Sequence, residues 1–494
     1  MTEIIKSLAK GKKLWIAAGV IGIWLVIRQV TKRKSPPGPF AVPVLGNIIQ
    51  MQPYIKKFHS HLFFWDVFQQ YGDIVQLTLG GKPLIILSDP TEIKRCLNSD
   101  EEFIRGDEIK IAMEGVASEA LFSQPSGEVW KRHRKILQPS FGPSHIKYAA
   151  VVSNNFAWKL TECWLKELNQ KEEHRVEFHS AMTAFALDVI GMVGFQYDFE
   201  SVANWIANKP AQGVETLSSI GKLVMNRLFT PTFLWGLSSL NADHPTNLQM
   251  TNHIDSIIKN MVKVKLETGE QKTNWDADIL ERLLFANQND KENFTQAEII
   301  DELKGFFFAG HETTANTITF VILVFCLYPD ILARVREDTK SIDLKDSNSL
   351  YESIPKLKYL DSVLKETQRL YPVVGRTGRQ AKKDINILGY DIQKGTTILL
   401  MFANANKHPT YWENPEVFNP NRFDRTPISG SFLPFGDGPM NCIGQKMAVL
   451  EAKIVTIHLV RHFNFKLSPG FVPDVVTSLT TGLKDGLYVN ISKA

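Results

Sequence analysis

Cysteine is scarce in this sequence, and its four cysteines lie far apart, at Cys96, Cys163, Cys326 and Cys442. Such wide and unrelated spacings form neither a disulfide framework nor the paired pattern of a zinc site. Because disulfides form mainly in oxidising compartments, we expect a reducing environment for the folded part of the chain. At least one thiol is then available for chemistry.

A strong excess of one charge sign is also lacking. The net charge is only +4 at pH 7, and the basic residues are dispersed. Nucleic-acid binding usually requires a clustered basic surface, so we exclude nucleic acid as a partner. With 44% hydrophobic and 22% charged residues, the composition is that of an ordinary globular protein. No internal repeat follows Gly38, so one large domain fits the length as well as several small ones.

The N-terminus differs from the rest of the chain. Leu14 to Ile27 is an uninterrupted apolar run with basic residues on both sides. As a helix it would rise about 21 Å, short of the roughly 30 Å hydrocarbon core of a membrane. A cleaved secretory signal is the alternative, but no small-residue cleavage site follows the run. We therefore predict a membrane anchor and basic linker over residues 1–35, and a catalytic domain over residues 36–494.

One long helix is predicted in the second half of the chain. Thr295 and Glu298 form a capping box, and apolar residues continue to the stop at Pro329, for about 33 residues or 50 Å. The centre of this apolar helix carries the polar run Ala309 to Thr314. These residues could mark a kink with satisfied side chains. They could equally form a polar site that faces a cavity and passes protons.

Two further patterns lie downstream. Glu366 and Arg369 are three residues apart in a helical stretch, a spacing that alone most often marks a surface pair. Short β-like runs follow at Ile385 to Leu388 and Thr396 to Met401, before the stretch FGDGPMNCIG around Cys442. A free cysteine is usually buried and inert. The glycine spacing around this one favours a functional thiol.

Taken together, these residues resemble the cytochrome P450 family over essentially the whole chain after the anchor. Five motifs match in the family's order: Trp130 with Arg134, Ala309 to Thr314, Glu366 with Arg369, Pro420 to Phe423, and the cysteine stretch Phe435 to Gly444. The resemblance implies a mainly α fold with a small β region. It also implies that haem lies between the long central helix and the cysteine loop, and that the protein is a haem-thiolate monooxygenase.

For the cysteine loop, the resemblance makes Cys442 the axial ligand of haem b. A thiolate ligand requires a depressed pKa, which the start of the following helix and the iron would favour. Gly436 and Gly444 would let the backbone approach the sulfur and the porphyrin. Phe435 would pack beside the thiolate and limit water.

For the long helix, the resemblance makes Thr313 the residue that binds dioxygen and Glu312 part of the route that delivers protons to it. Ala309 would lie against the haem, and it excludes the covalent haem link that some fatty-acid hydroxylases form through a glutamate at this position. Thr313 and Glu312 together favour monooxygenation. A P450-fold isomerase or dehydratase without reductase, and a non-catalytic membrane haem or sterol binder, remain alternatives.

The resemblance also assigns supporting roles. Glu366, Arg369 and Arg422 resemble the buried triad that holds the loop before the cysteine, where a half-made ion network would be costly.

The residues that match haem propionate contacts are Trp130, Arg134 and Arg379. One departure is Met440, which stands where the family commonly carries a basic residue for a propionate. We therefore expect weaker haem retention.

The substrate is predicted only as a class. The segments that match the family's recognition regions are mostly apolar or small, which favours a lipophilic substrate such as a sterol, fatty acid, terpenoid or xenobiotic. They are Ile104 to Phe122, Phe306 to Thr314, Val373 to Thr377 and Ser478 to Leu483. Thr230 to Leu237 matches a lipid-facing access region, with a loop of buried core residues as the alternative.

The resemblance to microsomal members implies electrons from NADPH through a cytochrome P450 reductase, with cytochrome b5 as a further partner. It implies an endoplasmic reticulum membrane location, a cytosolic catalytic domain and a part in lipid metabolism. Complementary positive charge for the reductase could come from Lys131, Arg132, His133 and Lys135.

Overall fold

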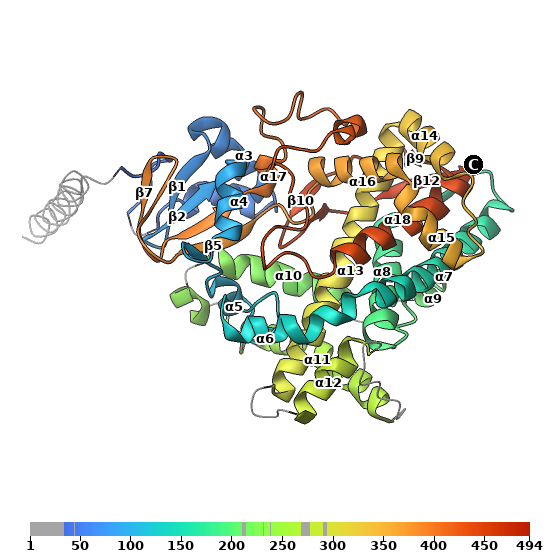
Figure 1. Ribbon diagram of the computed structural model, residues 1–494, viewed down its shortest axis with the longest axis horizontal. Coiled ribbons are helices and arrows are strands. Elements are labelled where there is room, and N and C mark those ends of the chain that lie inside the picture. Colours follow the sequence, from blue (N-terminus) through green and yellow to red (C-terminus); the bar gives the residue numbers. More distant parts are fainter. Residues whose placement is uncertain are drawn as a thin grey trace, which may run out of the picture.

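The computed structural model describes residues 34–43, 45–209, 214–230, 232–237, 239–267, 277–289 and 294–494. The apolar run of the predicted anchor therefore lies outside the described residues. Helices make up most of the described chain, and short strands form small sheets beside them (Figure 1). The predicted mainly α fold with a small β region is confirmed.

The central element is helix α13, Gln296–Leu327. Thr295 caps it in the predicted capping box, since its side chain accepts from the Glu298 N–H and Glu298 bonds back. The helix is continuous through its polar centre. The hydroxyls of Thr313, Thr317 and Thr319 each donate to the carbonyl four residues earlier, at 2.7 to 2.9 Å. Burial on both sides of this centre makes α13 the axis of the helical core.

Helix α8, Phe178–Phe195, packs along α13 and is apolar on nearly all sides. Among the unbroken helices of the described ranges, α8 alone is long and apolar enough to cross a membrane. However, 83% of it is buried inside the protein. It therefore belongs to the core. Helix α18, Gln445–His462, packs against α7, Pro143–Leu168, and also contacts α13.

The largest sheet has the order β1-β2-β8-β5-β3, and all its neighbouring pairs are antiparallel except β2 with β8. In Figure 1 its strands lie at the left, away from the long helices. Of the predicted strand-like runs, Ile385 to Leu388 forms β6 and Thr396 to Met401 forms β8. The bounds are β1 Ile74–Leu79, β2 Lys82–Leu87, β3 Phe103–Ile104, β5 Thr377–Ala381, β6 Ile385–Ile387 and β8 Thr397–Leu400.

A hairpin of β10, Val475–Thr477, and β11, Thr481–Leu483, brings the C-terminal region back beside α13. At Gly482 the approach is so close that a Cβ would lie 2.7 Å from the Asn316 side-chain oxygen. Helix α3, Ser60–Tyr71, contacts β10 on the hairpin's other side. The hairpin thus joins the sheet side of the molecule to the centre of α13.

The remaining elements surround this frame. The helices are α2 Ile48–Ile55, α4 Pro90–Asn98, α5 Glu108–Ala112, α6 Glu128–Leu137, α9 Ser201–Ile206, α10 Val214–Leu228, α11 Pro245–Glu267, α12 Ile279–Asn289, α14 Pro329–Thr339, α15 Ser347–Ser353, α16 Lys358–Leu370 and α17 Phe402–Ala405. The strands are β4 His174–Glu177, β7 Tyr390–Ile392, β9 Phe463–Leu467 and β12 Tyr488–Lys493. Short 3-10 helices span Gln138–Phe141, Thr232–Leu237, Ile354–Lys356 and Pro420–Asp424.

Candidate active site

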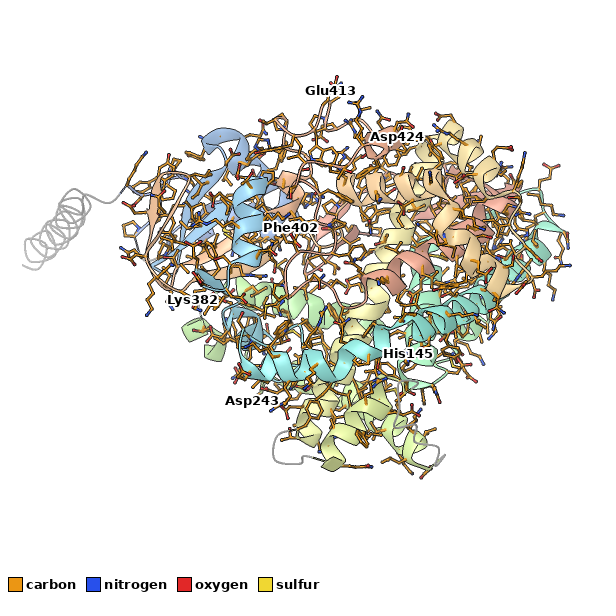
Figure 2. All side chains as sticks on the ribbon, viewed as in Figure 1. His145, Asp243, Lys382, Phe402, Glu413 and Asp424 are labelled. Atoms are coloured by element: carbon orange, nitrogen blue, oxygen red, sulfur yellow. The ribbon has the colours of Figure 1, made fainter. Side chains whose placement is uncertain are left out.

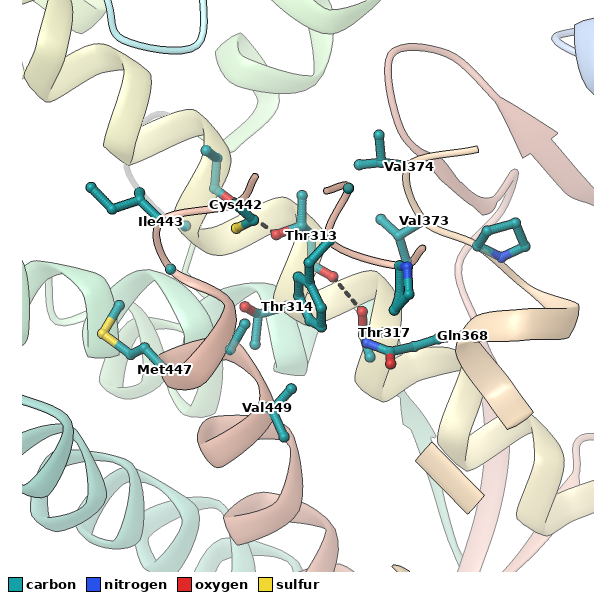
Figure 3. A pocket seen from close by; sticks show the side chains of 18 of the residues that line it. Thr313, Thr314, Thr317, Gln368, Val373, Val374, Cys442, Ile443, Met447 and Val449 are labelled. Atoms are coloured by element: carbon teal, nitrogen blue, oxygen red, sulfur yellow. Dashed lines mark hydrogen bonds between the residues drawn. The ribbon is translucent and has the colours of Figure 1, made fainter. Parts of the chain in front are cut away.

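A cavity lies between the centre of α13, the cysteine loop, the start of α18 and the segment after α16 (Figure 3). Its volume is about 1380 Å³, counting its open mouth. Phe402, labelled in Figure 2, lies on its wall. Of the predicted residues the wall contains Ala309, Thr313, Val373, Val374, Thr377, Arg379, Phe435, Gly436, Met440, Cys442 and Gly444. The structure therefore brings the long helix and the cysteine loop to one space, as the resemblance implied.

The cysteine loop depends on glycine at two positions. Gly436 and Gly438 have φ of 71° and 70°, in the left-handed region that other residues rarely adopt. At Gly438 a Cβ would also lie 2.4 Å from the Leu97 carbonyl oxygen. The Cys442 N–H donates to the Phe435 carbonyl at 2.9 Å and closes the loop. Cys442 is thereby held at the cavity wall, two residues before Gly444 caps α18.

Within the protein alone the pKa of Cys442 is raised, so the depressed pKa that the resemblance implies would depend on the iron. Burial raises the pKa of this thiol, and the opposing effects of the Gly444 N–H and of Arg134 are smaller. The loss of water therefore outweighs the amides at the helix start and the nearby guanidinium. A positive metal ion is the remaining influence able to favour the thiolate.

Behind the loop, Glu366 and Arg369 are both completely buried. Arg369 donates to both Glu366 oxygens, at 2.7 and 2.9 Å, and Arg422 donates to the same carboxylate at 3.2 Å. The Asn419 N–H adds a fourth bond at 2.8 Å. The E-x-x-R pair is therefore a buried network that connects α16 to the segment before the cysteine loop, and not a surface pair.

Of the three predicted propionate contacts, Arg379 lines the cavity. Arg134 lies beside it, donating to the Asn441 carbonyl at 2.8 Å and to the Asn441 side chain at 3.0 Å. Trp130 does not line the cavity and packs in the helical core. Sequence reasoning missed Arg105, which lines the cavity and reaches only backbone carbonyls, at 3.3 to 3.4 Å.

The charges of Arg105 and Arg379 are uncompensated: neither forms an ion pair with a carboxylate in the described ranges. Burial, with Arg379 and Arg134 nearby, lowers the pKa of Arg105 to about 9. Burial also lowers the pKa of Arg379. A thiol on the wall and two such guanidinium groups fit haem, which carries a metal ion and two carboxylates.

Met440 also lines the cavity, where the resemblance would place a basic residue for a propionate. Its sulfur accepts a long contact from the Ser126 hydroxyl, 3.7 Å away, and Ser126 also accepts the backbone N–H of Arg105 at 2.8 Å. Met440 and Arg105 both line the cavity, so Arg105 brings to this wall the kind of charge that Met440 lacks. No sequence pattern around Arg105 predicts that it lies at the cavity wall.

In the centre of α13, Thr313 lines the cavity and donates to the Ala309 carbonyl at 2.8 Å (Figure 3). Glu312 accepts a hydrogen bond of 2.6 Å from Thr480, between β10 and β11. Its other carboxylate oxygen is buried without a partner. Burial raises the pKa of Glu312, and the Thr480 hydrogen bond opposes this. Glu312 is thus a carboxyl group beside the cavity whose pKa lies above that of an exposed glutamate.

A second buried acid, Glu451 on α18, was also missed. It lines the cavity, and burial raises its pKa to about 8 although a Thr314 hydrogen bond opposes this. One of its oxygens has no partner. The sequence does contain a signal for Glu451, because it is an acid on the apolar face of the helix that follows the cysteine. Gly444 and Ala448, which also line the cavity, lie on the same side of that helix.

The expected basic surface around Trp130 is smaller than the sequence suggests. His133 is fully buried, with Nδ1 2.5 Å from a Glu302 oxygen and Nε2 3.2 Å from Glu298. Arg132 is paired with Glu298 at 2.5 Å. His133 therefore cannot present charge to a partner, and Lys131 and Lys135 are the exposed members of the run.

Comparisons with known proteins agree with this arrangement. A family model described as Cytochrome P450 matches residues 36–484. Cytochrome P450 3A9 of Rattus norvegicus is 27% identical over 88% of this chain and 86% of its own length. Cytochrome P450 3A5 of Homo sapiens is 26% identical over 94% of this chain and 92% of its own. Protein LUTEIN DEFICIENT 5, chloroplastic, of Arabidopsis thaliana is 28% identical over 89% and 76%.

Proposed function

The chain belongs to the cytochrome P450 family, and from this premise we propose that it inserts one oxygen atom of O2 into a lipophilic substrate, using electrons from NADPH. As a cytochrome P450 monooxygenase it is an oxidoreductase. The observation that carries the proposal is the shared cavity of Cys442 and Thr313, with the buried acid Glu312 beside it. Cys442 lies far in sequence from Glu312 and Thr313, which are neighbours in α13.

The residues that would hold haem b are Cys442 as ligand of its iron, and Arg379, Arg105 and Arg134 for its carboxylates. Phe435, Gly436, Gly444 and Ala309 would lie against it. When bound, the haem supplies the iron chemistry of oxygen activation, with electron density from the thiolate. Trp130 stays a predicted contact, although its ring lies in the core. The network of Glu366, Arg369 and Arg422 would keep Cys442 in position.

Proton delivery would fall to Thr313 and Glu312. The Thr313 hydroxyl is at the cavity wall and can both accept and donate a proton. Glu312 holds a proton more readily than an exposed glutamate because it is buried. Its unpartnered oxygen is free to bond to a water, through which the two side chains would be connected. A site without oxygen activation has no need of this pair, which favours monooxygenation over isomerisation or dehydration.

The substrate, partners and location follow the same proposal. The cavity wall is mostly apolar, through residues such as Ile190, Phe306 and Val373, which supports a lipophilic substrate. In the segment Thr230 to Leu237, the Trp235 side chain is buried against Arg227, which favours the core alternative for that residue. A flavin reductase, cytochrome b5 and the endoplasmic reticulum membrane complete the proposal, with residues 1–35 as anchor.

The reduced, carbon-monoxide-bound absorption spectrum tests the site. In the wild type we expect a red-shifted Soret band, because the iron ligand is a thiolate. Cys442→Ser should lose that band while the chain still folds. A wild-type protein that binds haem without this band would contradict the assignment of Cys442.

Turnover with and without NADPH and reductase separates the reaction classes. A monooxygenase consumes NADPH and O2 together with substrate, whereas an isomerase or dehydratase turns over without them. Product formation that is independent of the reductase would replace our proposal with that alternative.

A further inference from the structure

Arg376 lies at the edge of the cavity but faces away from the predicted haem contacts. It directly precedes β5, and Val374 and Thr377 on either side of it line the cavity. Arg379, three residues further along, also lines the cavity, whereas Arg376 does not. The Arg376 side chain points toward α3 and the end of α10, where its guanidinium lies near the rings of Phe64 and Phe229.

The surroundings of Arg376 are aromatic and nearly apolar. Its guanidinium carbon lies 5.6 Å from the ring centre of Phe64 on α3 and 5.8 Å from that of Phe229, just after α10. Its two hydrogen bonds are long, 3.4 Å to the Met225 sulfur and 3.4 Å to the Ser478 carbonyl. Most of its five N–H donors are therefore unused.

No carboxylate in the part of the chain that the structure describes pairs with Arg376. One charged neighbour is His61, whose other charged neighbours are His59, Lys407 and Asp474. Asp474 bonds to His59 at 2.9 Å, and Lys407 pairs with Glu416. His61 lies 3.0 Å from the Thr477 hydroxyl, and burial, with neighbouring positive groups, lowers its pKa to about 4. Burial alone lowers the pKa of Arg376 to about 10.

A buried arginine with a purely structural role looks different in the same protein. Arg227 is also buried beside an aromatic ring, yet it donates to the carbonyls of Leu240, Ala112 and Glu114 at 2.7 to 3.0 Å. Such bonds offset the loss of water around the charge. Arg376 lacks them, and aromatic faces compensate only in part. Its charge is therefore available for an anion from outside the chain.

We propose that Arg376 binds the anionic head group, a carboxylate, of an amphipathic substrate whose apolar part lies in the cavity. This rests on the proposed function and narrows its substrate class from lipophilic molecules in general to those that carry an acid. The planar guanidinium suits a carboxylate because two parallel hydrogen bonds can form. The rings of Phe64 and Phe229 keep water away and strengthen the pairing. Val373 and Val374, which precede Arg376 in the chain, line the cavity and would contact the apolar part of such a substrate.

Equilibrium dialysis of the haem-loaded protein tests the proposal without turnover. The probes are dodecanoate, methyl dodecanoate and dodecyl sulfate at micromolar concentration. We expect the wild type to bind dodecanoate about 10-fold or more tightly than the ester, since a hydrogen bond to a charged group contributes about 1.5–3 kcal/mol. Binding of both anions identifies recognition of negative charge, and binding of dodecanoate alone identifies a carboxylate site.

Two variants and a control localise the effect. Arg376→Gln should bind acid and ester equally. Arg376→Lys keeps the charge without the planar fork and should retain only part of the preference. Lys407→Gln removes a neighbouring positive charge that is already paired, and it should leave the preference unchanged. Haem content, measured for each protein, shows that it is folded.

Equal binding of acid and ester by the wild type would overturn the proposal. So would a preference that survives in Arg376→Gln or is unchanged in Arg376→Lys. Because dialysis needs neither NADPH nor reductase, a preference for acids together with absent oxidation would contradict the proposed reaction and leave the head-group site standing. Oxidation with no preference for acids would support the proposed reaction and contradict the head-group site.

Discussion

Arg369 and Arg105 are both guanidinium groups removed from bulk water, but they differ in their partners. Arg369 donates to the Glu366 carboxylate at 2.7 and 2.9 Å, and to the Asn406 carbonyl at 2.9 Å. Arg105 reaches only carbonyl oxygens, at 3.3 to 3.4 Å. Behind the cysteine loop the chain supplies its own anion. At the cavity it leaves that role to a ligand.

The buried acids show the same contrast. Glu366 is bonded by two arginines and a backbone N–H, whereas Glu312 and Glu451 each have one oxygen without a partner. A carboxylate with full partners has its hydrogen bonds made within the chain, whereas burial with few partners raises the pKa of a carboxyl group, as at Glu312 and Glu451. For these residues, pairing is complete behind the cysteine loop and incomplete at or beside the cavity, where we propose that ligands and protons enter.

The largest effect is expected where the pairing is complete. Glu366→Gln leaves Arg369 buried without an anion, which should lower the free energy of unfolding by about 3–5 kcal/mol. Because the same carboxylate holds the segment before Cys442, the variant should also lose most of its haem. Denaturant unfolding and the ratio of haem to protein measure the two effects.

The matched control is Glu128→Gln, which breaks an exposed pair with Lys131. It should change neither stability nor haem content measurably, since exposed pairs contribute little. If the two variants behaved alike, the buried network would not be the scaffold that its geometry indicates.

The pH dependence of the free energy of unfolding tests the incompletely paired acid Glu451. In the folded protein burial raises its pKa to about 8, while the unfolded chain releases that proton near its ordinary value of 4.5. Between these values unfolding releases a proton, so stability is fully present below pH 4.5 and is lost as the pH rises to about 8.

Glu451→Gln carries no proton to release, so this decrease should disappear and the variant should be the more stable protein at pH 8. Denaturant unfolding of both proteins over this pH range measures the difference. Parallel pH dependences would show that Glu451 is not the neutral acid we describe.

Arg105 tests whether a ligand completes the pairing at the cavity. Arg105→Met should speed the transfer of haem to a competing apoprotein about 10-fold, because one charge-assisted bond is lost. Met440→Arg, which introduces the basic residue that the family commonly carries at this position, should slow transfer in the same assay. Arg334→Met is the control, since Arg334 lies over the Tyr359 ring and away from the cavity. Unchanged transfer in Arg105→Met would mean that this arginine does not hold the haem.

Features that depend on residues close together in the sequence could be predicted, and features that depend on contacts between distant residues could not. Thr295, Glu298 and Pro329 mark the ends of α13 by local rules, so the helix was predicted to within a residue or two. The cysteine loop was marked by its glycines in the same way. The contact between Thr480 and Glu312 joins residues 168 apart, and Arg105 lies far from Cys442 in the chain. No local pattern encodes such contacts, because tertiary packing decides them.

His133 was misplaced for a different reason. The run from Lys131 to Lys135 was taken as a charged surface, but α6 buries Trp130, His133 and Leu137 together. Their spacing of three and four residues is that of one helix face. The periodicity therefore carried the correct signal, and the count of basic residues obscured it. The same face explains why Trp130 packs in the core.

The smallest effect is expected at Thr480, whose hydroxyl gives Glu312 its one hydrogen bond from a side chain. That bond favours the charged carboxylate, while burial raises the pKa of Glu312. Thr480→Val keeps the shape and removes the donor, so the pKa of Glu312 should rise further and the group should keep its proton to higher pH. If Glu312 delivers protons, the alkaline limb of the kcat profile moves to higher pH. Thr480→Ser retains the hydroxyl and should follow the wild type. Coincident profiles for valine and serine would mean that the unpaired oxygen of Glu312 takes no part in proton delivery, and that incomplete pairing there reflects packing alone.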